Sequence, residues 1–594
     1  MRNDPHSFAR PEEAIVKNIR LDATVDFETK TITAKASIDI ENIKAVKQLY
    51  LDSNDLTIER VTIGAAETPG RFSLGEPARY LGRPLIIEIQ PDTTLIHIYY
   101  RTSPSAAALQ WLDPAQTSGG KMPFLYTQSQ AILARSWVPC QDTPGVRMPY
   151  QARIHVPRDM MAIMSAENVT VKNPTGIYEF NMPQRIPSYL LALTVGDLEF
   201  RATGPRTGVY SEPAMVEKAA WEFGETEKMI EAAEKLYGPY RWGRYDLNIL
   251  PPSFPWGGME NPRLTFATPV VIVGDRSLVS LVAHELAHSW SGNLVTNATW
   301  DDFWLNEGFT TYFDHRIMEA VYGKEYDDML SVLSVQDLQK EVRELGPTNS
   351  DTQLKTDFTG RDPEDTATQI PYEKGQFFLR TIEQAVGRPR FDAFLKGYFD
   401  HFAFQSITTE DFLDYLREHL IRGDKTLEES LRIQDWVYKP GLPSNMVKVR
   451  STALEKVDEQ MREWVEGKSL NAVDTSKWST QHWMHFIRMI PENVGADKMK
   501  ELDSAFHFSH SQNAEILHEW LLQVIARQYK PAYSAIERLL EMSGRRKYVK
   551  SIFTALIRTP DGLRFARGFY GKLRPRYHAV TRDIGDRLLQ WNEK

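Results

Sequence analysis

The sequence has few of the features that mark secreted or membrane proteins. Its 594 residues include one cysteine, Cys140, which excludes an internal disulfide framework and favours a reducing compartment. No stretch approaches the ~18 consecutive apolar residues of a membrane span. The first residues, from Met1 to Arg10, lack the apolar segment of an export signal. We therefore expect a cytoplasmic protein that does not enter a membrane.

A large excess of charge is also missing. The formal net charge is -9, and basic residues are scattered along the chain instead of forming the stripe that a phosphate backbone requires. We therefore expect no nucleic-acid partner. Hydrophobic residues at 42% and charged residues at 25% are ordinary for a folded globular chain. Nothing in the pattern indicates an interface between copies, so the expected state is a monomer.

The chain is long enough for about three or four domains of ~150 residues, and its first part is rich in strand patterns. Apolar and polar residues alternate strictly from Ile32 to Ile40, which is the period of a half-buried strand. Three further segments are typical of strands: 85–89 and 95–100, which flank Pro91-Asp92 as in a hairpin, and 189–200. Residues 1–205 are therefore predicted to form a β domain, which ends at the turn-rich segment 204–208.

Helical periodicity dominates the remainder. Predicted helices cover 214–237, 278–291, 301–322 and 374–386, and a capping box at Thr408-Thr-Glu-Asp411 begins another. We therefore predict a mixed, helix-rich domain over 206–440, a linker over 441–450 and an all-helical domain over 451–594.

The strongest chemical motif is His284-Glu285-Leu286-Ala287-His288. On a helix, positions four residues apart share one face, so His284 and His288 can bind one Zn²⁺ while Glu285 lies beside the vacant coordination position. The alternative is a pair of solvated histidines on a helix with an unrelated glutamate between them.

A third ligand is available downstream. Glu307 lies on the next predicted helix, separated from His288 by 18 residues, and the aromatic run Trp300 to Leu305 would pack that helix against the first. His284, His288 and Glu307 are therefore predicted to hold one zinc ion per chain. Asp314, two turns further on, could support a ligand, but a solvent-facing carboxylate is the favoured interpretation.

The spacing of these motifs resembles a known family. HExxH followed by 18 residues and Glu307, together with Gly257-Gly258-Met259-Glu260-Asn261, resembles the gluzincin aminopeptidases. Four further segments resemble the leukotriene A(4) hydrolase and aminopeptidase B branch: Gln128-Ser-Gln130-Ala, Pro139 to Pro144, Pro371 to Gly375 and Gly544-Arg545-Arg546-Lys547. This resemblance implies a multidomain α+β fold, with an amino-terminal β saddle, a thermolysin-like catalytic domain and a helical superhelix.

The resemblance also implies roles for individual residues. Glu285 would be the general base and Tyr372 the donor to the oxyanion. Glu260, with Gln128 and Gln130, would bind the free α-ammonium group of the substrate. Arg545 and Lys547 would bind the carboxylate of a short peptide. The remaining implied substrate-binding residues are Trp256, Gly257, Gly258, Met259 and Asn261.

Without the resemblance, each of these motifs has an ordinary structural interpretation. Tyr372 would be a buried structural tyrosine, and Gly257-Gly258 a simple turn. The glutamines would be ordinary strand residues, and Gly544 to Lys547 a solvated run of charge.

Three positions depart from the leukotriene A(4) hydrolase pattern. Ala367 stands where that branch has a second tyrosine, Glu364 replaces an aspartate deep in the pocket, and Trp256 replaces a tyrosine before the glycines. The peptidase residues are therefore complete, whereas the residues for lipid epoxides are not.

The favoured function is removal of amino-terminal residues from short peptides, with Glu364 selecting Arg or Lys side chains. If Asp362, Glu364 and Asp365 instead form a solvated loop, Leu, Met or Ala substrates should be preferred. The alternatives from other classes are a bifunctional or lipid epoxide hydrolase, and a non-enzymatic helical scaffold. A scaffold should have lost a zinc ligand or the base, and none is missing.

Overall fold

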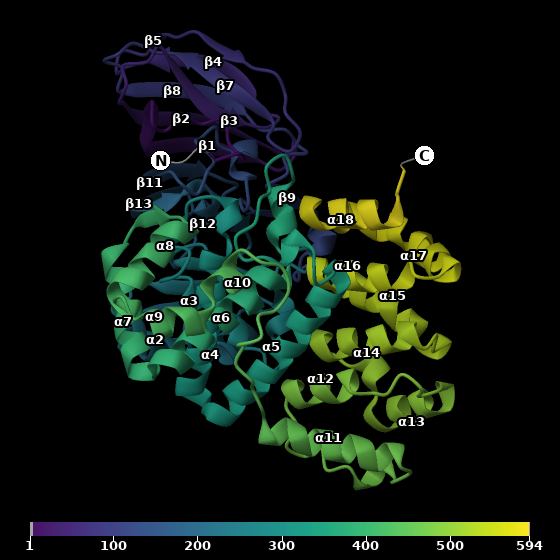
Figure 1. Cartoon of the computed structure of the whole chain (residues 1–594). Helices are drawn as coiled ribbons and strands as arrows, with labels where there is room; N and C mark the ends of the chain where they lie inside the picture. The colour runs from purple at the N-terminus through teal and green to yellow at the C-terminus, as the bar shows by residue number, and fades with distance from the viewer. Residues whose placement is uncertain (1–3, 593–594) are drawn as a thin grey trace.

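The amino-terminal third of the chain is built from three β-sheets (Figure 1). The computed structural model describes residues 4–592. The strands of this part are β1 (Ala14–Asp26), β2 (Thr31–Asn42), β3 (Gln48–Ser53), β4 (Thr57–Ile63), β5 (Thr68–Pro69), β6 (Phe72–Leu74), β7 (Arg83–Glu88), β8 (Leu95–Arg101), β9 (Leu109–Leu112), β10 (Phe124–Thr127), β11 (Arg147–His155), β12 (Met161–Met164), β13 (Ile177–Pro187) and β14 (Leu193–Gly196).

The largest of these sheets has seven strands in the order β13-β11-β1-β2-β8-β4-β5, and the four-stranded sheet has the order β12-β14-β10-β9. In the antiparallel β1–β2 pair, Ile19 lies opposite Ile38 and Leu21 opposite Ala36. All four side chains are buried, whereas the residues between them in β2 are more exposed. The alternating pattern therefore predicted β2 correctly.

The predicted hairpin around Pro91-Asp92 is wrong. β7 pairs with β3 and β6 in a three-stranded sheet, whereas β8 pairs with β2 and β4 in the seven-stranded sheet. The turn carries the chain from one sheet to the other. Turn residues indicate where a chain reverses, but they do not determine which strand it then joins.

A five-stranded sheet connects the first part to the catalytic part, in the order β15-β16-β17-β19-β18. Its strands are β15 (Glu199–Ala202), β16 (Thr207–Ser211), β17 (Tyr245–Ile249), β18 (Gly258–Met259) and β19 (Leu264–Ala267). The segment 189–200 therefore contains the end of one sheet, β14, and the start of another, β15. The predicted boundary at 205 falls in the turn between β15 and β16, which pair with each other, and the domain limits remain predictions.

The catalytic part is rich in helices. They are α1 (Val216–Glu222), α2 (Thr226–Tyr237), α3 (Ser280–Ala287), α4 (Trp304–Tyr322), α5 (Lys324–Leu345), α6 (Gly375–Val386), α7 (Arg388–His401), α8 (Thr409–Leu416), α9 (Lys425–Leu431) and α10 (Ile433–Val437), and a short pair of strands, β20 (Val295–Asn297) and β21 (Gln405–Ile407), lies between them. Of these helices, α1 and α3 contact the five-stranded sheet. The predicted helix over 214–237 is two helices, because the chain is interrupted around Gly224. The capping box at Thr408 is present as predicted.

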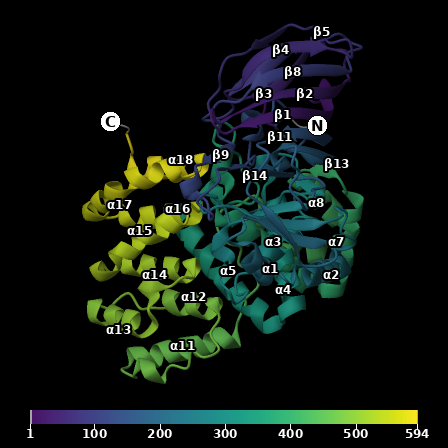
Figure 2. The ribbon, with the colours of Figure 1, turned by 180° about the vertical axis from the view of Figure 1, so that it is seen from behind.

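The carboxyl-terminal part is entirely helical, as predicted. Its helices are α11 (Thr452–Val465), α12 (Thr480–Arg488), α13 (Ala496–Phe506), α14 (Ala514–Ala526), α15 (Tyr533–Met542), α16 (Arg546–Leu556), α17 (Pro560–Leu573) and α18 (Ala579–Leu589). They stack in a column beside the catalytic part, seen from both sides in Figures 1 and 2. Met329 on α5 belongs to the hydrophobic core of this column, so α5 packs directly against it.

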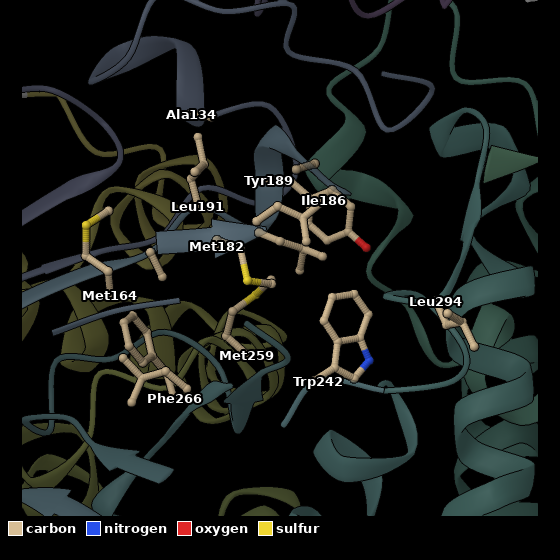
Figure 3. Packing of buried hydrophobic residues seen from close by; sticks show 14 of the residues in the cluster. Ala134, Met164, Met182, Ile186, Tyr189, Leu191, Trp242, Met259, Phe266 and Leu294 are labelled. Carbon is tan, nitrogen blue, oxygen red and sulfur yellow. The ribbon is translucent and has the colours of Figure 1, made fainter. Parts of the chain in front are cut away.

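A continuous hydrophobic core joins the first two parts. Figure 3 shows Met182 from β13 and Met259 from β18 in one cluster of buried hydrophobic residues, which also includes Phe266 and Trp242. The strand that carries Met259 is therefore anchored on the amino-terminal part. No helix among residues 4–592 combines the length and apolarity needed to cross a membrane.

Candidate active site

A cavity of about 1560 Å³ lies where the three parts of the chain meet. Its wall includes Gln130 from the amino-terminal part, His284 from α3, Glu364 from the loop after α5, and Arg545 from the turn before α16. Residues from all three parts of the chain therefore face one cavity.

Three side chains in this wall converge as metal ligands. His284 lies on α3, His288 at its carboxyl end, and Glu307 on α4. An oxygen of Glu307, Oε2, lies 3.3 Å from Nε2 of His284 and 3.5 Å from Nε2 of His288. The three side chains can therefore hold a single ion, with two imidazole nitrogens and one carboxylate oxygen as donors.

The second ring nitrogen of each histidine is already occupied. His284 donates from Nδ1 to Oδ2 of Asp314 at 2.8 Å, and His288 donates from Nδ1 to the carbonyl oxygen of Ser291 at 3.1 Å. Both Nε2 atoms are therefore left with a lone pair for a metal. The expectation that Asp314 faces solvent is wrong: only 8% of this residue is exposed, because α4 turns it toward α3.

The charges of the site fit a cation. Burial lowers the pKa of His288 to about 4, so its imidazole is neutral at neutral pH, as a metal ligand must be. Glu260, Glu285 and Glu307 are all buried near it, and Oε1 of Glu260 has no hydrogen-bond partner in the described part of the chain. Burial raises the pKa values of Glu260 and Glu285, the latter to about 8. Such a cluster is stable when positive charge enters it.

A second possible donor group, Glu260, Glu285 and His288, overlaps the first. Only the set of His284, His288 and Glu307 uses both histidines whose orientation is fixed by a hydrogen bond through the other nitrogen. We therefore assign the metal to that set, and it leaves Glu260 and Glu285 free for the substrate and for proton transfer.

Close backbone packing brings Glu307 and Tyr372 into the same site. A Cβ atom on Gly308 would lie 2.7 Å from Cα of Gly375, so only glycine lets α4 approach the start of α6 so closely. Tyr372 lies three residues before Gly375, in a π-helical turn. Its ring stacks on His284 at 5.9 Å between ring centres. The two glycines therefore position the tyrosine beside the metal ligands.

The glycines of the Gly-Gly-Met-Glu-Asn motif also make room for functional side chains. A Cβ on Gly258 would lie 2.2 Å from Oε1 of Glu285, and a Cβ on Gly257 would lie 2.7 Å from Nη2 of Arg545. The sequence predicts that these glycines admit the substrate. The contacts show that they also admit the base and an arginine from the carboxyl-terminal part.

The predicted amine pocket is only partly in the cavity wall. Glu260 and Gln130 line the cavity. Gln128, Met259 and Asn261 are buried and do not line it. Nε2 of Gln128 donates to Sδ of Met259 at 3.3 Å, so these two side chains support the wall from behind.

Arg545 and Lys547 both line the cavity and share a partner that the sequence did not indicate. Oε1 of Glu515 accepts a hydrogen bond from Arg545 at 2.6 Å, and Oε2 accepts one from Lys547 at 2.7 Å. The nearby positive charges hold the pKa of Glu515 well below its usual range despite its burial. Ion pairs with Glu515 therefore hold Arg545 and Lys547 in place, although Lys547 remains exposed to solvent.

Glu364 faces the cavity and is half-buried, so the solvated-loop interpretation of this position is wrong. Its Oε1 accepts a hydrogen bond from the backbone N–H of Ala131 at 2.5 Å. Burial raises the pKa of Glu364 to about 8. Trp256 and Ala367 line the same cavity, and so does Arg546, a residue to which the sequence analysis gave no role.

A histidine pair on one helix and a carboxylate on the next, with a buried glutamate beside them in the wall of a large cavity, define a zinc-dependent hydrolase. Comparison with known protein families supports this class. The family model for the peptidase family M1 domain matches residues 221–436, the model for the peptidase M1 N-terminal domain matches 15–190, and the model for the leukotriene A4 hydrolase C-terminal domain matches 478–589.

Similar proteins match over almost the whole chain. Leukotriene A-4 hydrolase of Xenopus laevis is 36% identical over 97% of this chain and 98% of its own length. Leucine aminopeptidase 2 of Yarrowia lipolytica is 36% identical over 99% of this chain and 93% of its own. The structure of yeast LTA4 hydrolase in complex with Bestatin, at 31% identity, has a TM-score of 0.92 and covers 99% of this chain and 98% of that chain.

The chain therefore belongs to the M1 family of zinc-dependent aminopeptidases, with the helical carboxyl-terminal domain of the leukotriene A4 hydrolase branch. Membership confirms the predicted resemblance and the predicted three-domain fold. It also implies a zinc cofactor, which the donor set described above fits.

Proposed function

We propose that this zinc aminopeptidase removes amino-terminal residues from short peptides, with His284, His288 and Glu307 as the ligands of its metal. One observation carries the assignment to an exopeptidase. Only 4% of Glu260 is exposed, its Oε1 has no hydrogen-bond partner within residues 4–592, and the residue lines the same wall as the metal ligands. A free α-ammonium group is the part of a peptide that satisfies such an oxygen.

The side chains of the site have complementary roles in hydrolysis. When bound, zinc supplies a Lewis acid that activates a water molecule near neutral pH and polarises the scissile carbonyl. Glu285 accepts the proton of the attacking water on a carboxylate oxygen and returns it to the leaving amine. Tyr372 donates its phenolic O–H to the oxygen of the scissile carbonyl as negative charge develops there.

The two ends of the substrate are recognised by opposite charges. Glu260 and Gln130 bind the α-ammonium group, and Gln128, Met259 and Asn261 keep that wall in place from behind. Arg545 and Lys547 bind the terminal carboxylate of the peptide. A cavity with both anchors favours tripeptides and tetrapeptides over long chains. Trp256, Gly257 and Gly258 form the wall between the two anchors.

The side chain of the first residue enters the part of the cavity that Glu364 lines. We propose that ionised Glu364 pairs with Arg or Lys there, which gives a preference for basic residues. Comparison of kcat/KM for Arg and Leu amides in wild type and Glu364→Gln tests this preference. An Arg to Leu ratio that is the same in both proteins would remove Glu364 from the selection.

Several broader properties complete the proposal. The two possible donor groups share His288, which supports one zinc ion per chain. Cys140 is free and buried, which supports a reducing, cytoplasmic location. We propose a monomer with no nucleic-acid or membrane partner.

Hydrolysis of a lipid epoxide is the second candidate function, because two relatives with this architecture are named leukotriene A4 hydrolases. In this chain Ala367 offers no hydroxyl, and Glu364 carries its carboxylate one methylene further than the expected aspartate. The cavity therefore lacks one expected polar group and places the other differently. A non-enzymatic scaffold is disfavoured because all three ligands, the base and the tyrosine are present.

A panel of fluorogenic amides of Arg, Lys, Ala and Leu tests the peptidase. We expect turnover that a chelator abolishes and zinc restores, and that acetylation of the α-amine prevents. The matched variant is Glu260→Gln, which should lose discrimination between free and acetylated substrates. Absence of turnover by the zinc-loaded protein on every amide and tripeptide tried would refute the function.

A further inference from the structure

Arg546 lies in the wall of the active-site cavity, beside the positions that depart from the leukotriene A4 hydrolase pattern. Its Cζ atom is 5.4 Å from the centre of the Trp256 ring, and its Nη1 donates to the carbonyl oxygen of Ala367 at 3.2 Å. Glu364 lines the same cavity. Only 6% of Arg546 is exposed. Arg546 therefore contacts two of the three departing positions, Trp256 and Ala367, and shares the cavity wall with the third, Glu364.

The backbone fixes the position of this charge. The N–H of Arg546 donates to the carbonyl oxygen of Pro255 at 2.7 Å, and the N–H of Gly544 donates to that of Pro252 at 2.8 Å. A Cβ on Gly544 would lie 3.2 Å from Cα of Ser253. The start of α16 is therefore docked on the loop that leads into Gly257, and the charge of Arg546 is held beside the substrate wall.

Neighbouring charges are paired, whereas Arg546 is not. Arg545 and Lys547 both bind Glu515, and Asp365 lies 3.2 Å from Arg587. Within residues 4–592, Arg546 forms no ion pair with a carboxylate.

Glu364 likewise forms no ion pair within residues 4–592; its Oε1 accepts a hydrogen bond from the backbone N–H of Ala131. The two groups interact electrostatically. Arg546 lowers the pKa of Glu364, against the effect of burial, and Glu364 raises the pKa of Arg546. Within residues 4–592, Arg546 and the ionised form of Glu364 thus place opposite charges in one wall with no ion pair between them. Each is available to a charged group of the substrate.

We propose that Arg546 is a specificity-determining residue, which opposes Glu364 and so limits the preference of this enzyme for basic amino-terminal side chains. The proposal rests on the aminopeptidase function and deepens it. A cationic side chain that approaches Glu364 also approaches the guanidinium of Arg546, which repels it. An uncharged side chain is neither attracted by Glu364 nor repelled by Arg546. An acidic side chain is attracted by the same guanidinium.

The test compares kcat/KM for Arg, Leu and Glu amides in wild type and Arg546→Met, which removes the charge and keeps a long flexible side chain. We expect the Arg to Leu ratio to rise about tenfold, as the loss of one like charge in a partly desolvated site implies. We expect the Glu to Leu ratio to fall. Arg546→Lys keeps the charge and should retain ratios close to those of wild type.

A structural role gives a different result. If Arg546 only supports the fold, Arg546→Met will change kcat/KM for the three amides by the same factor, and that outcome overturns the proposal. Ratios in Arg546→Lys that match those of Arg546→Met would overturn it as well. Arg576→Met is the matched control, since Arg576 is an exposed arginine of the same domain outside the cavity wall. It should leave all ratios unchanged.

The experiment also separates this proposal from the function on which it depends. If zinc-loaded wild type cleaves none of the amides, the aminopeptidase assignment fails. If wild type cleaves them and the ratios do not respond to Arg546→Met, the aminopeptidase assignment stands and the role of Arg546 fails.

Discussion

Oδ2 of Asp314 lies 2.8 Å from Nδ1 of His284, and both side chains are largely buried. Asp314 follows Glu307 by two helical turns on α4, so one helix carries a metal ligand and also orients another ligand on α3. The hydrogen bond fixes the tautomer of His284 and makes its Nε2 more basic. Assembly of the metal site therefore depends on the packing of α3 against α4.

We predict that Asp314→Ala weakens zinc binding by about 10- to 100-fold, because His284 loses the partner that orients it. Competition with a chromogenic chelator measures the affinity directly. Asp328→Ala is the control, since Asp328 forms an exposed pair with Lys324 on α5. Zinc affinity in Asp314→Ala equal to that of wild type would show that His284 is held by packing alone.

Glu285→Gln should retain zinc and lose hydrolysis by at least ~10²-fold, because the base lies beside the metal ligands and not among them. Gly258 contacts this side chain closely, and glutamine has nearly the same shape, so the fold should be kept. Elemental analysis and turnover are measured on the same sample. Loss of zinc together with activity would place Glu285 among the ligands instead.

Tyr372→Phe should lower kcat on the order of 10²-fold and change KM little, since its hydroxyl is needed mainly as charge develops on the carbonyl oxygen. The stacking of the ring on His284 needs no hydroxyl, so zinc affinity should remain. A rise in KM that matches the loss of kcat/KM would argue that Tyr372 binds the substrate in its ground state.

Lys547→Met should raise KM for a tripeptide with a free carboxylate on the order of tenfold, because the substrate carboxylate then keeps Arg545 and loses Lys547 as a cationic partner. The same tripeptide with an amidated carboxyl end is the control, and its KM should not change. Glu515 binds both cations, so it keeps Arg545 in position in the variant. Equal effects on both tripeptides would place the carboxylate elsewhere.

The sequence predicted most of the metal site because its information is local. The spacing from His284 to His288 determines a shared helical face, and Glu307 follows on the next helix. Asp314 was misassigned because α4 is buried on all sides from Trp304 to Met318 although polar residues are distributed around it, so periodicity did not distinguish its buried polar positions from exposed ones.

The sequence also did not predict which strands pair and which distant side chains meet, for a related reason. β7 and β8 follow each other in the chain but join different sheets, and a strand pattern carries no information about its neighbour. Glu515 and Arg546 gained their roles only when the helical column docked on the catalytic part, which placed α14 and α16 at the cavity. A run of charge in a sequence does not reveal such docking.

The last prediction concerns pH. Burial raises the pKa of Glu364 to about 8, the nearby carboxylates of Asp362 and Asp365 act in the same direction, and Arg546 and the N–H of Ala131 oppose them. With that pKa, Glu364 is about 10% ionised at pH 7 and about 90% ionised at pH 9. The charge that pairs with a basic side chain is therefore mostly absent at the lower pH and present at the higher pH. The guanidinium of an Arg substrate stays charged throughout this range.

The ratio of kcat/KM for Arg over Leu amides should thus rise as pH increases from about 7 to 9, by up to about tenfold. Titrations common to both substrates, such as that of the α-ammonium group, cancel in the ratio. In Glu364→Gln the ratio should not vary with pH, since no carboxyl group remains at that position. A wild-type ratio that is constant across this range, with turnover intact, would mean that the ionisation of Glu364 does not select the side chain.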